Sequence, residues 1–187
     1  MRRHAFAAAL LSLAACTDPV ERALTAPVTV TTAREEGTPQ NFQTHLVGDA
    51  EVPARETPAQ GNVKFQLSDD GQSLSYKLIA SNIENVIQAH IHLGPATCAC
   101  PVVVFLYGLV PPNAGRTDGV LAEGVITQAN MIGPLAGRPF EVLLDNIRAG
   151  NTYVNVHTRS TTLPPLVAGN YPGGEIRGQI DHGNGMH

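Results

Sequence analysis

Charged side chains are scarce in this sequence, and neither sign dominates. Of 187 residues, 15% are charged, and 16 acids against 12 Lys and Arg give a formal net charge of −4 at pH 7. A nucleic-acid-binding domain normally carries a basic face and an alkaline isoelectric point, whereas the value here is about 5.9. The composition therefore excludes a basic nucleic-acid footprint.

Several familiar enzyme motifs and long apolar runs are also missing. There is no Gly-x-Ser-x-Gly elbow, no phosphate-binding loop and no His-Glu-x-x-His. Beyond the N-terminal region the longest apolar run is 102–107, far short of the ~20 residues of a membrane-spanning helix. The 43% apolar share still supports a packed core, and 18 Gly plus 14 Pro indicate a turn-rich chain rather than a low-complexity one.

The N-terminus has the pattern of an export signal. Residues 1–4 are basic, and residues 5–15 form an apolar run that is too short to span a bilayer. The run ends in Leu-Ala-Ala-Cys at 13–16, which resembles the lipobox of bacterial lipoproteins. We therefore expect residues 1–15 to be a signal peptide and Cys16 to be lipidated. The alternative is an ordinary secretory signal cut near Ala15, with Cys16 a stray thiol.

Three further segments follow from composition. Residues 16–40 are rich in Thr, Pro and Glu and are predicted to form a flexible tether. Residues 41–181 form the folded domain, and 182–187 form a Gly/His tail. The protein is thus predicted to be exported to the cell envelope, facing the periplasm or the outer surface, with its lipid in the membrane.

Alternation of apolar and polar residues dominates the domain. Phe42, Thr44 and Leu46 share one face of a predicted strand, and Asp69-Asp70-Gly71 marks a hairpin turn. The predicted strands are 42–47, 63–67, 74–80, 86–93, 102–107, 120–127, 152–158 and 175–181. Eight short strands separated by turns are typical of an all-β sandwich or barrel.

One stretch has helical spacing instead. Phe140, Leu143, Leu144 and Ile147 recur every three to four residues, after Pro139 and before the stop signal at 150. We predict a single short helix there.

The strand 86–93 and the strand 152–158 carry candidate metal ligands. His90 and His92 share a face, with Cα atoms about 6.6 Å apart, opposite an apolar stripe. His157 shares its face with Tyr153 and Asn155. If the two strands are neighbours, three imidazoles converge and would suit Zn or Cu. The alternative is that the histidines are structural and hydrogen-bond to backbone carbonyls. The first strand adds His45 as a possible fourth ligand.

Cys98 and Cys100 follow the first histidine pair. A disulfide between them would close a very small ring and be easily reduced. Alternatively, both thiolates would bind a soft ion such as Cu(I). Glu51, Glu123 and Glu175 are interpreted as solvated acids, and the alternative is that they act as paired carboxylates. Near the C-terminus, we expect structural roles for Gly174, which permits a turn with positive φ, for Glu175, and for Arg177, which is suited to clamp a carboxylate.

Five blocks of the sequence together resemble the chordin-type (CHRD) domain, found in chordin and in many bacterial exported proteins. The blocks are 46–53, 89–94, 101–104, 148–158 and 172–180. The resemblance implies an all-β sandwich and brings no firmly assigned activity. Cys98, Cys100 and His45 depart from the usual pattern and add potential ligands.

The histidine strands also resemble part of copper/zinc superoxide dismutase, a Greek-key sandwich. That resemblance implies His90, His92 and His157 as ligands, but the sequence lacks a His-rich zinc loop with a bridging histidine. The leading expectation is a Greek-key β-sandwich that binds Cu or Zn and is anchored by its lipid. A non-catalytic binding or adhesion module with structural histidines is the alternative, and a dismutase-like oxidoreductase is the weaker one. Catalysis is not indicated.

Overall fold

The structure is a computed structural model, and it describes residues 40–182. The predicted signal peptide, the lipidation site Cys16, the tether up to residue 39 and the tail from residue 183 lie outside the described residues.

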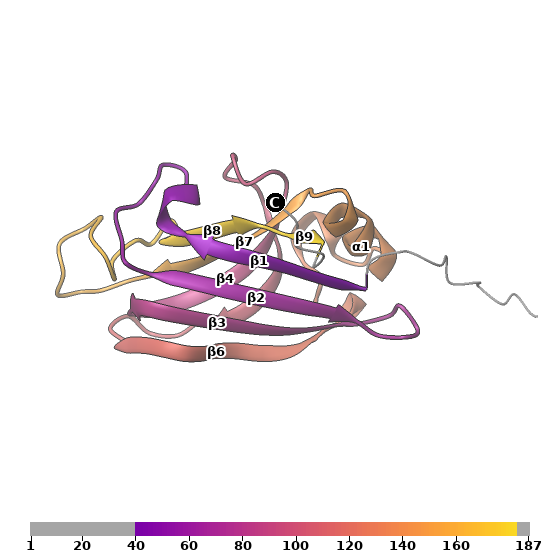
Figure 1. Ribbon diagram of the computed structural model, residues 1–187, viewed down its shortest axis with the longest axis horizontal. Helices are drawn as coiled ribbons and strands as arrows, with labels where there is room; N and C mark the ends of the chain where they lie inside the picture. Colours follow the sequence, from indigo (N-terminus) through magenta and orange to yellow (C-terminus); the bar gives the residue numbers. More distant parts are fainter. Residues whose placement is uncertain (1–39, 183–187) are drawn as a thin grey trace, which may run out of the picture. The chain divides into compact units, whose positions relative to one another are not determined.

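The described chain forms nine strands, connected in antiparallel pairs (Figure 1). They are β1 (Asn41–Val47), β2 (Gln60–Leu67), β3 (Leu74–Glu84), β4 (Val86–Leu93), β5 (Val102–Gly108), β6 (Arg116–Ile126), β7 (Thr152–Thr158), β8 (Ile176–Gln179) and β9 (Asp181–His182). All eight predicted strands are present, and the two-residue β9 follows β8 and pairs with β1. The all-β prediction is confirmed.

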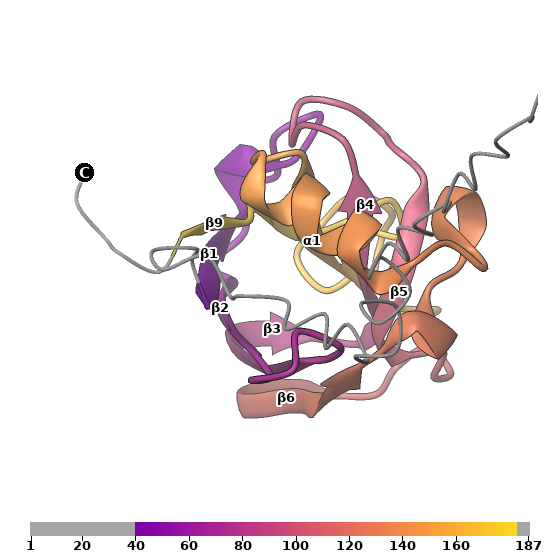
Figure 2. The ribbon, with the colours of Figure 1, turned by 90° about the vertical axis from the view of Figure 1, so that its right-hand side faces the viewer.

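The strands form one sheet that curls into a nearly closed, barrel-like sandwich. The order around it is β5-β4-β7-β8-β1-β2-β3-β6, and Figure 2 shows the strands arranged around a common centre. The Tyr76 hydroxyl of β3 donates to the Leu106 carbonyl of β5 at 2.7 Å, which links β5, at one end of this order, to β3, the neighbour of β6 at the other end. β4 and β7 are neighbours, as the histidine prediction requires.

Alternate residues of each strand fill the centre. In β2, Gly61, Val63, Phe65 and Leu67 are buried while the residues between them are exposed. Because β-strand side chains alternate between faces, this pattern gives one inner and one outer surface. Phe42, Leu46, Leu78, Ile91, Val154 and Ile176 extend the same core.

The predicted helix is confirmed as α1 (Phe140–Arg148). Its four apolar residues, Phe140, Leu143, Leu144 and Ile147, are all buried. Figure 2 shows α1 lying across one end of the barrel. Short 3-10 turns occur at Gly48–Ala50, Gln128–Asn130 and Gly133–Leu135. Within residues 40–182, no helix has the length and apolar character needed to cross a membrane.

Candidate metal centre

The wall formed by β4 and β7 is buried on both of its faces. All seven residues of β7 are buried, although Tyr153, Asn155 and His157 point away from the barrel centre. Loop segments 48–59, 94–101 and 159–175 contact this outer face through hydrogen bonds to Asn155, His92 and His157, respectively. Polar side chains on the wall are therefore shielded from water.

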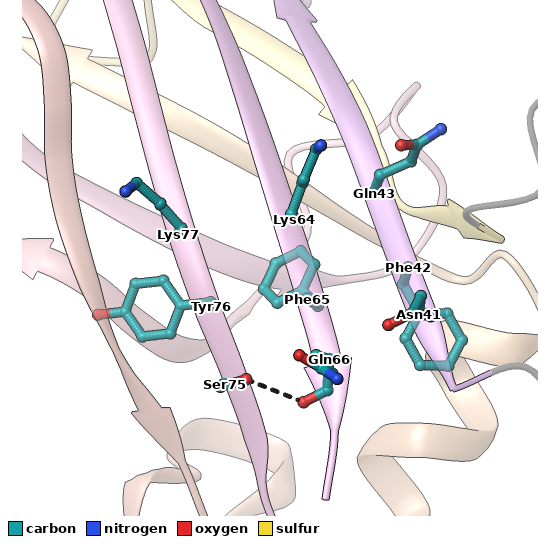
Figure 3. Close-up of a pocket in the computed structure, with 9 residues that line it drawn as sticks. All are labelled: Asn41, Phe42, Gln43, Lys64, Phe65, Gln66, Ser75, Tyr76 and Lys77. Atoms are coloured by element: carbon teal, nitrogen blue, oxygen red, sulfur yellow. Dashed lines mark hydrogen bonds between the residues drawn. The ribbon is translucent and has the colours of Figure 1, made fainter.

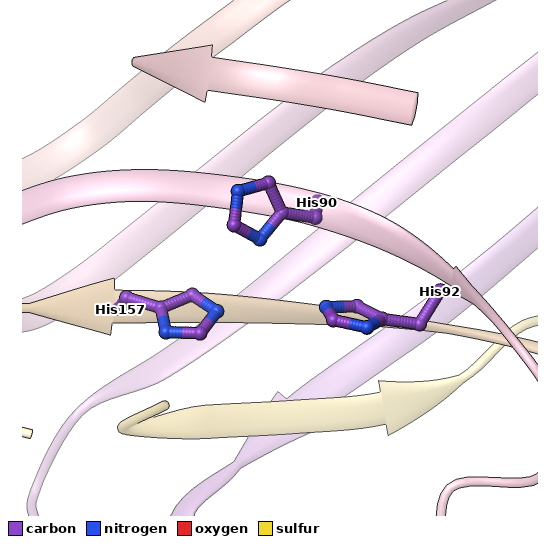
Figure 4. Close-up of side chains that lie close together, drawn as sticks. All are labelled: His90, His92 and His157. Atoms are coloured by element: carbon purple, nitrogen blue, oxygen red, sulfur yellow. The ribbon is translucent and has the colours of Figure 1, made fainter. Parts of the chain in front are cut away.

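Three histidines meet under this cover (Figure 4). His90 and His92 lie on β4, and His157 on the adjacent β7. Ring centroids are 5.6 Å apart for His90 and His92, 5.0 Å for His90 and His157, and 6.5 Å for His92 and His157. One nitrogen from each ring lies within 4.8 Å of the other two. The predicted convergence is thus present in the structure.

Backbone carbonyls fix the tautomer of two of the rings. His92 Nδ1 lies 2.7 Å from the Cys100 carbonyl oxygen, and His157 Nδ1 lies 2.8 Å from that of Pro172. A carbonyl can only accept, so each neutral ring carries its proton on Nδ1. Nε2 of each ring is left with a lone pair.

Asn155 brings a third acceptor to the same place. Its Oδ1 lies 2.9 Å from His92 Nε2 and 3.0 Å from His157 Nε2. Its Nδ2 faces the Glu51 carboxylate at 3.5 Å, and a flipped amide would turn Oδ1 toward that carboxylate instead. Three lone-pair atoms therefore converge, an arrangement that a cation would stabilise.

His90 has no hydrogen-bond partner on either ring nitrogen, and both nitrogens are buried. Its ring meets Phe105 edge-on, with centroids 4.5 Å apart, and Phe105 is 45% exposed. A buried polar group without a partner costs about 1–3 kcal/mol. An imidazole held in this state is a candidate ligand.

The environment keeps these rings neutral. Burial, reinforced by His157 and His92, lowers the pKa of His90 from 6.5 to about 3. Burial also lowers the pKa of His157 to about 4, against the opposing effect of the Pro172 hydrogen bond. The pKa of His92 is lowered by burial as well. At neutral pH the imidazoles are thus in the form that binds metals.

A buried ion pair lies next to the histidine cluster. Arg177 Nη2 lies 2.9 Å from Glu51 Oε2, and both side chains are almost fully buried. Burial raises the pKa of the Glu51 carboxyl, while the Arg177 guanidinium opposes that rise. The expectation that Glu51 is solvated was wrong, because loop segments close over the carboxylate and Arg177 compensates its charge.

Aromatic stacking links Arg177 to the cluster. The Arg177 guanidinium lies 4.3 Å from the centroid of the Tyr153 ring, and that ring stacks on His92 with centroids 4.6 Å apart and planes 5° apart. Tyr153 is fully buried. The orientation of His92 is therefore held by its ring face as well as by Nδ1.

Gly174 and Glu175 both have structural surroundings, but the interpretation of Glu175 as a solvated acid was wrong, because its side chain is fully buried. Gly174 has φ of +120°, and a Cβ there would overlap the Glu51 carboxylate. The buried Glu175 carboxylate accepts hydrogen bonds from Thr57, Thr158 and the Gly169 amide. Glu123, by contrast, is exposed as expected and pairs with Lys77.

The other predicted ligands do not join the histidines. His45 is exposed on the outer face of β1, where its Nδ1 lies 3.1 Å from Asn62 Oδ1. It does not reach the other histidines because β8 separates β1 from β7. Cys98 and Cys100 form a disulfide, with Cα atoms 5.3 Å apart, so their sulfurs are not thiolate ligands in this structure.

A separate hollow of about 400 Å³ lies over β1, β2 and β3 (Figure 3). Lys64 and Lys77 sit side by side on its rim, in register across the two strands. No group of three metal-ligating side chains was found in the described residues other than the histidine cluster. The cluster is therefore the candidate functional site.

The comparison with protein families agrees with this architecture. The model of the CHRD domain matches residues 42–180. The chain belongs to the CHRD family. The match spans the whole barrel from β1 to the end of β8, including both histidine strands of the CHRD domain. A search of curated proteins found no match to this chain.

Sequence reasoning missed two supporting residues, Asn155 and Glu51. The alternation did place Asn155 on the face of His157, but a strand pattern does not show which rings an amide meets. Glu51 lies just after β1 in a loop, where no periodicity predicts burial.

Proposed function

We propose that this CHRD domain binds a transition metal, copper or zinc, through His90, His92 and His157. One observation carries the proposal: the Nε2 lone pairs of His92 and His157, together with an unpartnered His90 ring, converge in a buried site. Imidazole nitrogen is a preferred ligand for both metals. Asn155 Oδ1 would serve as a fourth metal ligand or would hold a metal-bound water by a hydrogen bond.

The surroundings of the rings fit this role. In metal sites, ligating histidines commonly donate their other ring N–H to a backbone carbonyl, as His92 and His157 do here. Zn–N bonds of about 2.0–2.1 Å place two ligand nitrogens no more than about 4.2 Å apart. The present spacing of up to 4.8 Å requires the rings to close slightly on binding.

We propose in addition that the protein is exported and anchored by lipidated Cys16. This part rests on the basic start, the apolar run and the lipobox-like Leu-Ala-Ala-Cys at residues 13–16. An anchored domain would handle its metal at the membrane surface in the cell envelope. The proposal covers metal binding and assigns no reaction.

Metal titration of single variants tests the site. His90→Ala removes a ligand that makes no hydrogen bond, and we expect Zn²⁺ and Cu²⁺ affinity to fall by about 100-fold or more. His45→Ala is the matched control, since it removes an exposed histidine outside the cluster. Isothermal titration and elemental analysis of the purified protein give affinity and stoichiometry.

The two variants should differ sharply in metal content. Wild type and His45→Ala should each hold one metal per chain at the tight site, and His90→Ala should hold none. Equal stoichiometry and affinity in all three would reject the metal site. In that case the histidines would be structural, as in a binding or adhesion module.

A further inference from the structure

The disulfide-closed loop between β4 and β5 lies against the histidine site. Residues 94–101 connect the two strands, and the loop is joined to β7 and β8 by hydrogen bonds of its backbone. The Cys100 carbonyl accepts the Nδ1 proton of His92 at 2.7 Å. The same pair of cysteines thus carries both a redox-sensitive bond and a contact to a metal-site ligand.

The backbone carbonyl of Cys98 also accepts hydrogen bonds from residues next to the histidine site. Cys98 O accepts hydrogen bonds from the Tyr153 hydroxyl at 3.0 Å and from Arg177 Nη1 at 2.8 Å. The Cys100 amide donates to the Tyr153 oxygen at 3.2 Å. Since Tyr153 stacks on His92, the loop controls both the ring nitrogen and the ring face of that histidine.

Gly94 packs closely against the two sulfurs on one side. A Cβ built on Gly94 would overlap Cys100 Sγ and lie 3.0 Å from Cys98 Sγ, so the backbone of Gly94 lies directly against them. Bonded sulfurs are about 2.05 Å apart, whereas two thiols need a van der Waals separation of roughly 3.5–4 Å. Gly94 blocks one side, so the added separation displaces the 98–100 segment and its carbonyls.

We propose that Cys98–Cys100 is a thiol–disulfide exchange site whose reduction weakens metal binding at His92. The co-reactant is a dithiol. One of its thiolates attacks the sulfur of one cysteine, which breaks the Cys98–Cys100 bond, releases the other cysteine as a thiolate and forms a mixed disulfide. The second thiolate of the dithiol then attacks the dithiol's own sulfur in the mixed disulfide and displaces the remaining cysteine as a thiolate. Two electrons and two protons pass to the loop, which gains two thiols, and the dithiol becomes a disulfide. Both cysteines are partly exposed, which allows the attack.

This inference rests on the proposed metal function, but its first readout does not need a metal. In the metal-free protein, His92 and His157 each donate an Nδ1 proton to a carbonyl, and only the His92 acceptor belongs to the disulfide loop. His157 is therefore an internal control. Treatment with dithiothreitol, in a chain carrying Cys16→Ser, should expose two thiols and speed exchange of the His92 ring proton by at least tenfold, as seen by NMR.

The second readout is zinc affinity. Cys98→Ser/Cys100→Ser lacks both the disulfide and the thiolates, so it isolates the effect of the loop from metal binding by sulfur. We expect its Zn²⁺ affinity to be about 10–100-fold below that of the oxidised protein, the usual effect of losing the partner of a ligating histidine. Dithiothreitol is removed before titration because it binds zinc.

The outcomes separate the two proposals. The thiol–disulfide proposal would be overturned by any of three results. These are an unchanged exchange rate of the His92 ring proton after reduction, no thiols exposed by the dithiol, or zinc affinity of the double variant within twofold of wild type. If the oxidised protein itself binds neither zinc nor copper, the metal function fails, whatever the proton exchange shows.

Discussion

The β2 wall and the β7 wall of the barrel differ in how their outward side chains meet solvent. In β2 buried and exposed residues alternate strictly, and its outward side chains, such as Lys64 and Gln66, meet solvent. In β7 every residue is buried, and its outward side chains include Tyr153, Asn155 and His157. Loops cover the second wall and leave the first open.

The difference distinguishes the wall that carries the candidate site. Outward polar residues on β2 are solvated, so they cost nothing to keep. The same kinds of residues on β7 must be hydrogen-bonded, ion-paired or coordinated, since burying an unpaired polar group is unfavourable. His90 has none of these compensations, and this supports the proposed metal site.

The largest contrast between the walls should appear in their ion pairs. Arg177→Met leaves the buried Glu51 carboxylate without its partner, and we expect unfolding free energy to fall by about 3–5 kcal/mol. Lys77→Met breaks the exposed pair with Glu123 on the open wall, where the cost should stay below about 1 kcal/mol. Urea unfolding of the metal-free proteins measures both. Equal losses would contradict the assignment of two different walls.

The stability of the domain should depend on pH through the buried histidines of the covered wall. The pKa values of His90 and His157 lie below the unfolded value of about 6.5, so the unfolded chain binds more protons in the window between them. Stability of the metal-free domain is fully present above pH 6.5 and falls as the pH drops. Between pH 7 and pH 5 we expect a loss of about 2–4 kcal/mol.

The control for this titration removes one of the titrating rings. His90→Leu should make the pH dependence shallower, by about 2 kcal/mol over the same range. Urea midpoints at pH 7, 6 and 5 provide the measurement. An identical slope in wild type and variant would show that His90 is not held neutral.

The smallest contrast concerns two asparagines that each face a histidine. Asn155→Ala removes the amide whose Nδ2 donates to the buried Glu51 carboxylate and whose Oδ1 faces both Nε2 atoms. We expect about 1–2 kcal/mol lower stability from the lost Glu51 contact and about tenfold weaker zinc binding. Asn62→Ala removes the exposed partner of His45 and should change either quantity by little, below about 0.5 kcal/mol in stability. Thermal unfolding and zinc titration of the pair would test this. A larger effect from Asn62→Ala would reverse the comparison.

Alternation and helical spacing were sufficient to predict the strands and α1, because side-chain periodicity is a local property. They also placed His90 and His92 on one face. The meeting with His157 depended on β4 and β7 being neighbours, which is a property of the topology and not of either segment. Burial of Glu51 depended on loop closure, and the isolation of His45 on its position around the barrel. Such long-range facts leave no periodic trace in the sequence.

Phe105 gives the site a particular relation to solvent. Its half-exposed ring stands edge-on against His90, so a side chain that itself meets solvent covers one side of that buried imidazole. Rotation of a partly exposed side chain is fast compared with the opening of a strand or loop. Chelators should therefore strip a bound ion from the intact domain without denaturant, which makes the centre suited to exchange its cargo rather than to store it permanently.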